Sequence, residues 1–393
     1  MHTYIRRFFR LGQIGKLGFV GFLSSFGIAL VGTIWSIYLE SYLHNPSYIG
    51  FISTIFMIIS LISYIVLIPI IQRFGKSFLF LLSLIFYFIS YFILSLATNV
   101  YLIIFIGVII SVFASLRGEV FGIIIADKSR KKEVSKNEGA IYTFFNLAWL
   151  IGPLVAGFIA KLYGFNKVFM WAAGFLLLSL ILFKEFDLKD KRKSRVSEQS
   201  FFSLIKEFFS NKQLFYVYLI SGGISLWWAF IYIYGPIYII EQGFGREFVG
   251  IFLFSVAIPL VLLEYVFGKL ASKIGMRKVF VLGYLLMGVS AIICFFVSNP
   301  FVLFGFVLLA SVGASMLEPT TEAYFFDITP ASQRDKFYGV YNTTIDVFYS
   351  LSTFLAGLVL LWFSFNYLFL LFGVILILMA GISMKVRNVV EEK

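Results

Sequence analysis

Six ionisable side chains lie well inside long apolar stretches of this chain, and they are the first candidates for chemistry. An ionisable group at the centre of a membrane helix costs about 2.5–3.5 kcal/mol on insertion scales, so apolar composition alone does not account for any of them. Each needs a partner, a proton or a ligand. The six are Arg117, Glu119, Glu264, Glu318, Glu322 and Asp346.

An internal repeat relates some of these positions. The segment Ser111-Val112-Phe113-Ala114-Ser115 recurs as Ser311-Val312-Gly313-Ala314-Ser315, a shift of 200 residues, and the same shift relates many other residues without a gap. Two halves related in this way normally enclose a path at the midplane of the membrane. Further pairs in the same register are Gly50 and Gly250, Gly75 and Gly275, Asp127 and Asp327, and Gly157 and Gly357.

Arg117 and Glu318 fall at nearly equivalent levels of the repeat, because position 317 is the mate of 117. The arginine could bind an anionic group or a nearby carboxylate. A carboxylate removed from water is costly, so Glu318 could carry a proton and exchange it for a cationic group. The alternative is an inert Arg–Glu pair that holds the halves together. Pro319 follows directly and is expected to break the helix locally and expose carbonyl groups.

The other four groups have narrower interpretations. Glu322 lies one helical turn from Glu318 and could pass protons toward the cytoplasm, or it could simply be solvated near the inner surface. Asp346 could accept hydrogen bonds from Arg73 and act in gating. For Glu264 we expect an ion pair with Lys269 or Lys273, and for Glu119 an ion pair on a packing face.

The elements that must position these groups are membrane-spanning helices. Hydrophobic residues make up 60% of the chain and its mean hydropathy is +0.95, which excludes a soluble globular protein. The apolar stretches are too long for barrel strands of about 10 residues. We predict twelve spans, near 17–41, 47–72, 77–98, 101–126, 139–162, 166–184, 214–240, 247–270, 278–298, 301–326, 337–363 and 366–385.

The twelve spans predict an all-α integral membrane fold. It consists of two pseudo-symmetric bundles of six helices each. Residues 1–184 form the first half and residues 214–393 the second. The connection 185–213 is a cytoplasmic linker, in which the spacing of Phe201, Leu204, Ile205, Phe208 and Phe209 predicts an amphipathic helix on the inner membrane surface.

Charge placement predicts the orientation. The net charge is +12, and 28 of the 32 Lys and Arg residues fall in the termini and in alternate loops. By the positive-inside rule both termini lie in the cytoplasm, and we expect a multi-pass protein of the cytoplasmic membrane. A nucleic-acid site would gather the charge on one folded domain, so no nucleic-acid partner is expected.

Residues for enzyme chemistry are scarce. The chain has two histidines, His2 and His44, and one cysteine, Cys294. They form no metal-ligand spacing, and no aqueous loop carries paired carboxylates. We therefore predict no enzyme activity, no metal and no cofactor.

The inner loops carry a family resemblance. The run from Gly268 to Lys278 (GKLASKIGMRK) resembles the loop signature of the major facilitator superfamily, and Gln72-Arg73-Phe74-Gly75-Lys76 is a weaker copy in the first half. Asp327-Ile328-Thr329-Pro330, followed by Arg334, is similar to the second loop signature of that family. Together with the twelve spans, the resemblance covers essentially the whole chain.

The loop signature implies a gating role. In the family such loops latch one half to the other, which assigns Arg73, Lys273 and Arg277 to gating together with Gly268. Gly75 and Gly275 are expected to permit tight reversals between helices. The acidic position of the signature holds Gln72 and Ser272 here, so this chain departs from the signature and has no carboxylate at that position.

A third motif bears on the direction of transport. Gly152-Pro153-Leu154-Val155-Ala156-Gly157 resembles an element of proton-linked drug antiporters in the same family. A purely structural role in close helix packing is equally compatible with it. The resemblance implies a secondary active transporter that works by alternating access, and this motif favours proton-coupled export of amphipathic compounds. Uptake of an anionic or sugar-like nutrient is the alternative. A lipid enzyme or a non-transporting sensor fits the sequence less well.

The resemblance also assigns residues to the cavity. It places Arg117 and Glu318 on cavity-lining helices, with aromatic residues of the first and seventh spans: Trp35, Trp227, Trp228 and Tyr232. Such rings could hold organic cations by stacking and cation–π contacts. Tyr38 and Tyr238 are expected in an interfacial aromatic belt instead. One chain contains a complete path, so the expected partners are a small molecule, H⁺ as coupling ion and the lipid bilayer, with a monomer sufficient for function.

Overall fold

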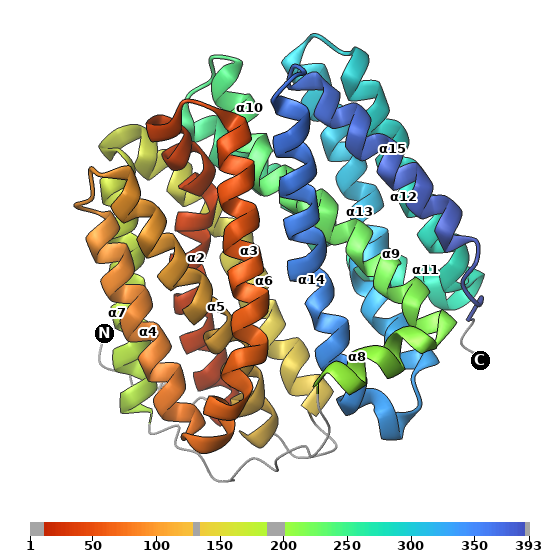
Figure 1. Cartoon of the computed structure of the whole chain (residues 1–393), viewed down its shortest axis with the longest axis horizontal. Helices are drawn as coiled ribbons and strands as arrows, with labels where there is room; N and C mark the ends of the chain where they lie inside the picture. Colours follow the sequence, from red (N-terminus) through yellow and green to blue (C-terminus); the bar gives the residue numbers. More distant parts are fainter. Residues whose placement is uncertain (1–11, 129–133, 187–200, 390–393) are drawn as a thin grey trace. The chain divides into compact units, whose positions relative to one another are not determined.

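The computed structural model describes residues 12–128, 134–186 and 201–389. Its helices in the first half follow the predicted spans closely. They are α2 (Gln13–Leu43), α3 (Pro46–Arg73), α4 (Lys76–Leu94), α5 (Val100–Lys128), α6 (Val134–Tyr163) and α7 (Phe165–Glu185) (Figure 1).

The second half begins with the short helix α8 (Phe201–Ser210). The seventh span is built from three consecutive pieces, and five further long helices follow it. The elements are α9 (Lys212–Ala229), η1 (Phe230–Tyr234), α10 (Gly235–Glu241), α11 (Arg246–Ile274), α12 (Met276–Phe296), α13 (Pro300–Ile328), α14 (Ala331–Leu360) and α15 (Asn366–Ser383).

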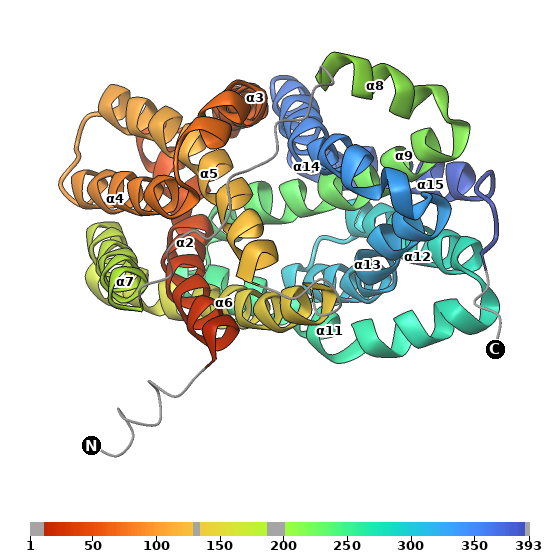
Figure 2. The same ribbon diagram turned by 90° about the horizontal axis from the view of Figure 1, so that it is seen from below.

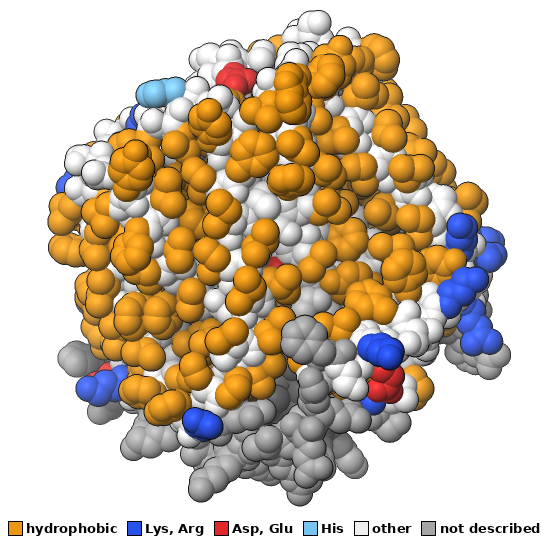
Figure 3. All heavy atoms as spheres, viewed as in Figure 1, with side chains coloured by type: hydrophobic (Ala, Val, Ile, Leu, Met, Phe, Trp, Pro, Cys, Tyr) orange, Lys and Arg blue, Asp and Glu red, His pale blue; other side chains and the backbone are white. Residues whose placement is uncertain are grey.

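Twelve of these segments are long and apolar enough to cross a membrane, and the described residues contain no strand. The predicted all-α, twelve-span fold is confirmed. Figure 3 shows hydrophobic side chains over most of the visible face, with most of the visible Lys and Arg at its lower and right margins. That distribution fits a surface in contact with lipid.

The described chain forms two compact units that differ slightly from the two sequence halves. The first unit takes residues 245–250 from the second half, and the second unit takes residues 39–58 from the first half. In the first unit α4 packs against α5 and α7; in the second, α12 packs against α13 and α15. Glycines allow the second packing to be close: a Cβ at Gly283 would meet the Gly313 carbonyl, and one at Gly288 would meet the Gly373 carbonyl.

Local sequence signals explain where several helices start and stop. Asn211 and Asn299 precede α9 and α13, and each side chain accepts a hydrogen bond at 2.9 Å from the backbone N–H two residues on. Arg334 closes the other end of α13, since its guanidinium donates to the carbonyls of Phe326 and Thr329. A cation on these carbonyls also opposes the negative end of the helix dipole.

The seventh span contains a π-turn that we did not predict from the sequence. The Gly235 N–H donates to the Phe230 carbonyl, the i→i+5 pattern of a π-helix. Pro236 follows and has no N–H to give to the preceding turn, so regular α-helical bonding cannot continue through it. The turn is anchored by Tyr234, whose hydroxyl donates to the Thr353 carbonyl at 3.1 Å.

Pro319, in contrast to Pro236, lies within a regular α-helix. We expected it to break the tenth span, but α13 runs through it without interruption. The hydroxyl of Thr320, the next residue, donates to the carbonyls of Met316 and Leu317 at 2.6 and 3.1 Å. The carbonyl that loses its helical donor at Pro319 is that of Ser315, so these bonds lie beside the proline and do not replace the missing one.

The amphipathic helix α8 lies beside α9 and α14 (Figure 2). Phe208 is fully buried there, with ring centroids 6.0 Å from Tyr218 and 5.7 Å from Phe337. Glu207 forms an ion pair with Lys336 at 2.6 Å. Part of the apolar face of α8 is thus covered by protein, where we had expected lipid. The rest of the predicted linker, residues 187–200, lies outside the described residues.

The two signature-loop glycines differ in conformation. Gly275 has φ 93°, in the region that favours glycine, and a Cβ there would collide with the Asn388 side chain. Gly75 has φ −66° and an extended backbone that any residue can adopt, so the expected glycine-specific reversal is absent in the first half.

This pair gives a matched test. We expect Gly275→Ala to lower the free energy of unfolding by about 1–2 kcal/mol, because the alanine must take a strained positive φ. Gly75→Ala should change it by less than about 0.5 kcal/mol. Thermal unfolding of the purified variants in one detergent measures both. Equal losses in the two variants would contradict the conformational explanation.

Candidate functional site

A carboxylate held by aromatic residues forms the centre of the candidate site in the second unit. The Trp228 Nε1–H on α9 donates to Glu318 Oε2 on α13 at 2.8 Å. The Trp228 ring lies 5.9 Å, centroid to centroid, from the ring of Tyr232 in η1. Glu318 is exposed, while Trp228 and Tyr232 are half-buried. This arrangement presents a negative charge beside two electron-rich rings, which is the chemistry that binds organic cations.

Glu322 continues the acidic line one turn along α13. The Tyr338 hydroxyl on α14 donates to its Oε1 at 2.5 Å. The ring of Tyr338 stacks on Phe326 with centroids 5.5 Å apart. Glu322 is half-buried and held by a specific donor, so the interpretation as a merely solvated residue does not describe it.

A further hydroxyl pair lies close to these carboxylates. Tyr341 shares a hydrogen bond of 2.6 Å with Ser221, and its ring stacks on Phe325 at 4.5 Å. Tyr341 is near enough to both Glu318 and Glu322 to interact with them electrostatically. Among the described residues these two hydroxyls bond to each other and not to a carboxylate.

Glu264 does not form the ion pair that we expected. Neither Lys269 nor Lys273 contacts it, and in the described part of the chain it has no hydrogen bond or ion pair. The lysines follow it by five and nine residues, which is about 140° and 180° around the helix, so they point to other faces.

Arg117 belongs to the first unit. It is half-buried near the hydroxyl groups of Tyr87 and Tyr91, both of which are buried. The Arg117 Nε is buried and has no hydrogen-bond partner among the described residues. Arg117 and Glu318 lie in different units, so their pairing stays a prediction.

Glu119 also departs from expectation. Its Oε1 is buried without a hydrogen-bond partner, and no ion pair to it occurs among the described residues. The side chain is half-buried on α5. The predicted ion pair on a packing face is wrong.

The aromatic candidates separate into two groups. Trp35 is half-buried, 6.3 Å from Tyr38 between ring centroids. Trp227 is wholly buried and packs on Phe230 at 5.6 Å, whereas its neighbour Trp228 reaches Glu318. Successive helix residues point about 100° apart, so only one of the two tryptophans can face the carboxylate. The structure therefore removes Trp227 from the surface of this site.

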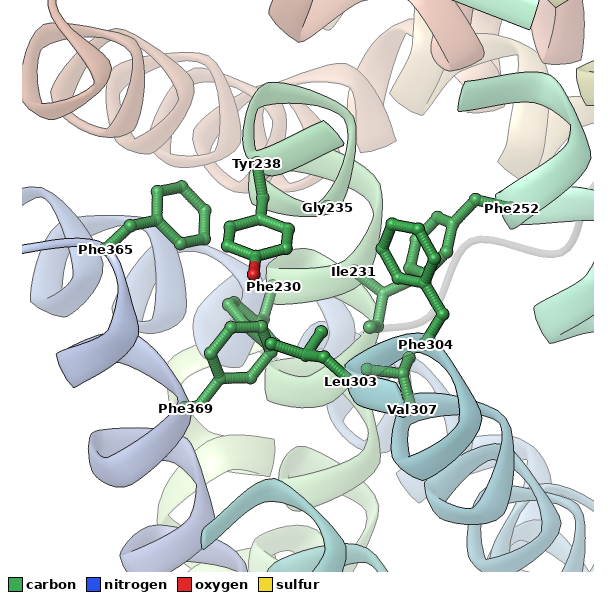
Figure 4. Close-up of a pocket in the computed structure, with 10 residues that line it drawn as sticks. All are labelled: Phe230, Ile231, Gly235, Tyr238, Phe252, Leu303, Phe304, Val307, Phe365 and Phe369. Carbon is green, nitrogen blue, oxygen red and sulfur yellow. The ribbon is translucent and has the colours of Figure 1, made fainter. Parts of the chain in front are cut away.

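Tyr38 and Tyr238 are not belt residues. Tyr38 is 2% exposed against Phe169, and Tyr238 is 4% exposed against Phe365 and Phe369. Tyr238 lines a small apolar pocket beside the π-turn, with Phe365 and Phe369 on one side and Phe252 and Phe304 on the other (Figure 4). Both tyrosines pack inside their units.

The motif around Gly152 makes close helix contacts. A Cβ at Gly152 would meet Ala29 of α2, and one at Gly157 would meet the backbone of Gly250. The Pro153 carbonyl lies against Gly250 as well. Close packing through small residues is thus one use of this motif. Because Gly250 and Gly157 are repeat mates of Gly50 and Gly357, the repeat implies a second contact of the same kind.

That second contact is present in the second unit. A Cβ at Gly50 would meet the backbone of Gly357 and of Thr353. The two contacts differ in their polar side chains. The hydroxyls of Thr54 and Thr353 lie 2.8 Å apart beside Gly50. Beside Gly250, Lys161 and Glu247 form an ion pair at 2.7 Å.

The described residues contain no group of three or more His, Cys, Asp or Glu that could hold a metal ion.

Comparison with known proteins decides the family. The family model of the Major Facilitator Superfamily matches residues 17–262 and 243–392. The chain belongs to the major facilitator superfamily. Its relatives include an MFS-type transporter and an export protein.

Two relatives align with most of this chain. An uncharacterized MFS-type transporter of Methanocaldococcus jannaschii is 22% identical over 86% of this chain and 89% of its own length. Multidrug resistance protein 2 of Bacillus subtilis is 25% identical over 93% of this chain and 92% of its own. A third, the staphylopine export protein of Staphylococcus aureus, is 24% identical over 64% and 66% of the two chains.

Solved structures share the fold at low identity. A POT family transporter in complex with a thioalcohol-conjugated peptide has a TM-score of 0.79 and 15% identity, with 94% of each chain covered. The nucleoside transporter NupG has a TM-score of 0.77 and 13% identity, covering 95% of this chain and 99% of that one.

The signature residues of the superfamily lie at the ends of helices. Arg73, Lys273 and Arg277 are exposed, and Gly268 has open space around it. Asp327 is exposed and Asp346 half-buried, and each has an interaction partner. The Gln72 side chain lies outside the described residues. Gating roles for these residues stay predictions; Arg334 has the separate structural role of closing α13.

Proposed function

We propose that this transporter exports amphipathic organic cations across the cytoplasmic membrane in exchange for protons, by alternating access. One observation carries the proposal: Glu318 lies beside the rings of Trp228 and Tyr232, and no cationic side chain pairs with it among the described residues of its unit. A carboxylate in such a place needs a counter-charge, and a proton or a substrate cation supplies it.

Glu318 then binds proton and substrate in alternation. The protonated acid is neutral and leaves the rings without an electrostatic partner for a cation. Release of the proton creates the charge that, with the faces of Trp228 and Tyr232, binds an organic cation. Since the two ligands compete for one carboxylate, each turnover exchanges one for the other.

Glu322 offers a step between Glu318 and water. It lies one turn away on the same face of α13 and accepts from Tyr338. Two carboxylates at this spacing interact, so protonation of one affects the other. We assign Glu322 to the proton route and the Tyr338 hydroxyl to holding its carboxyl group in place.

The relatives support export as the direction. Among them are a protein of Streptococcus pneumoniae named as a multi-drug resistance efflux pump and the staphylopine export protein. The positive charge of the termini and alternate loops supports both termini in the cytoplasm, and a chain with two complete halves supports function as a monomer.

Uptake of an anionic solute is the second candidate. The observation that favours it is Arg117, whose buried Nε has no hydrogen-bond partner among the described residues. A guanidinium with unused donors beside two phenols could bind a carboxylate or phosphate.

Proteoliposomes with an acidic interior and a trapped pH-sensitive dye test the proposal. Organic cations, anions and sugars are added in turn to the outside. We expect cations alone to make the lumen more alkaline, because each cation that enters through the protein releases a proton to the outside. Proton movement with anions and none with cations would favour the second candidate. No proton movement with any compound would contradict the proposal.

A further inference from the structure

The residues that follow α15 dock on other helices of the second unit. Residues 386–389, here called the strap, form hydrogen bonds with α9 and with the start of α12. In Figure 1 the strap belongs to the blue segment between the lower end of α15 and the label C. Its first residue, Val386, is buried, with 2% of its surface exposed. The strap and its partners all belong to the second unit.

The first attachment of the strap is a single oxygen atom on α9. The Oε1 atom of Gln213 accepts a hydrogen bond from the Arg387 backbone N–H at 3.1 Å. The same atom accepts a bond from the Tyr324 hydroxyl on α13 at 3.2 Å. An amide oxygen has two lone pairs, so both bonds can form together. Gln213 therefore joins the strap to two helices, α9 and α13.

The second attachment lies at the joint between α11 and α12. Gly275 is the single residue between these helices, and the Met276 N–H donates to the Val389 carbonyl at 3.1 Å. Met276 is the first residue of α12, where an N–H has no acceptor within its own helix. A Cβ at Gly275 would collide with the Asn388 side chain. The strap thus supplies an acceptor to α12 and packs against the glycine of the joint.

One buried atom of the strap opposes its docking. The Asn388 Oδ1 is buried and has no hydrogen-bond partner among the described residues. Water would bond this oxygen if the strap left the protein, so the docked state loses a hydrogen bond that the free segment makes. Against this loss stand the hydrogen bonds of Arg387 and Val389 and the burial of Val386. A segment held by so few contacts opens more easily than the helices beneath it.

We propose that the strap undocks reversibly while the spans stay folded, and that undocking frees the joint between α11 and α12. Undocking takes the Asn388 side chain away from Gly275 and the acceptor away from the Met276 N–H. Lys273 and Arg277, to which the superfamily signature assigns gating, flank this joint. The strap is therefore a conformational switch beside the signature loop. This inference does not depend on the substrate or the direction of transport.

Hydrogen exchange at the Met276 amide measures docking directly. The chain has eight methionines, so NMR of the full-length protein with isotope-labelled methionine gives few amide signals. Met287 is the internal reference, because it lies inside α12 and is fully buried. In wild type we expect the Met276 amide to exchange at least about tenfold faster than the Met287 amide, since the strap opens without the helix.

Two substitutions should change this exchange in opposite directions. Val386→Ala removes apolar surface that holds the strap and should speed exchange at Met276 about fivefold or more. Asn388→Leu replaces the unpartnered amide with an apolar group of similar shape and should slow it about threefold or more. Exchange at Met287 should stay within about twofold of wild type in both variants.

Arg387→Ala is the matched control in the strap itself. The Arg387 side chain is exposed, and the substitution keeps the backbone N–H that bonds Gln213. Exchange at Met276 should therefore stay within about twofold of wild type. Gln213→Leu removes the acceptor and loosens the strap by a second route, which keeps the test available if Val386→Ala folds poorly.

Three results would overturn the proposal. Equal exchange at Met276 and Met287 in wild type would show that the strap opens only when α12 unfolds. Equal acceleration of both amides in Val386→Ala would indicate a loosened protein and not a released strap. Faster exchange at Met276 in Asn388→Leu would show that the Asn388 amide stabilises docking.

Discussion

Glu318→Gln is expected to reduce proton-coupled transport by about 100-fold or more, because glutamine can neither release a proton nor neutralise a cation. The amide still accepts a hydrogen bond from Trp228, so the fold around it should persist. Substrate binding and proton exchange should therefore be lost together, while the thermal unfolding temperature stays close to that of wild type.

The lumen-pH assay with a monocation measures this loss, and Glu119→Gln serves as the control. Glu119 is also half-buried in a span, but it lies on α5 in the other unit, and its Oε1 has no hydrogen-bond partner among the described residues. A Glu318→Gln protein that still exchanges protons for cations at a rate near that of wild type would remove Glu318 from the coupling mechanism.

A disulfide between positions 54 and 353 is expected to stop transport. The hydroxyls of Thr54 and Thr353 lie 2.8 Å apart, so cysteines at both positions can bring their sulfurs together. Thr54 comes from the first sequence half and Thr353 from the second. The proposed alternating access requires the halves to rock against each other, and if transport works in this way a covalent bond between them should reduce flux by more than about tenfold.

The double variant is best made with Cys294→Ala, which removes the single native thiol. Oxidation should block transport in the double-cysteine protein, and reduction should restore it. Each single-cysteine protein, treated in the same way, should keep its flux. Full activity of the cross-linked protein would show that this contact does not need to open during transport.

Much of the fold could be predicted because hydropathy and the repeat are signals over many residues. The positions of twelve spans follow from a requirement of about 20 apolar residues each. The structure adds contacts that we did not predict from the repeat: Gly50 and Gly157 and their mates all take part in close glycine packing. Hydropathy and the repeat do not determine how each helix is rotated about its own axis.

Rotation explains most of the differences at the candidate site. Trp227 and Trp228 have identical side chains in adjacent positions, yet one is in the core and the other holds Glu318. Glu264 was assigned to lysines nearby in sequence, although their helical spacing already placed them on other faces. A stricter count of 3.6 residues per turn could have found that error from the sequence alone.

The two prolines show a different limit. Pro236 lies at a π-turn and Pro319 within an uninterrupted α-helix. Gly235 precedes the first, and the Thr320 hydroxyl bonds the Met316 carbonyl beside the second, but the residue type proline alone predicts neither outcome. A Gly-Pro pair inside an apolar span does not by itself locate the π-turn, because Gly152-Pro153 lies within the uninterrupted helix α6.

The two glycine contacts related by the repeat should respond differently to the solvent. Beside Gly250 the ion pair is accessible to water, with Lys161 51% and Glu247 14% exposed, so high salt weakens it as it does other exposed ion pairs. Beside Gly50 the neutral hydroxyls of Thr54 and Thr353 have no net charge to screen. High salt should thus weaken the contact beside Gly250 and leave the contact beside Gly50 unchanged. Salt concentration can therefore distinguish two contacts that are equivalent in the sequence repeat.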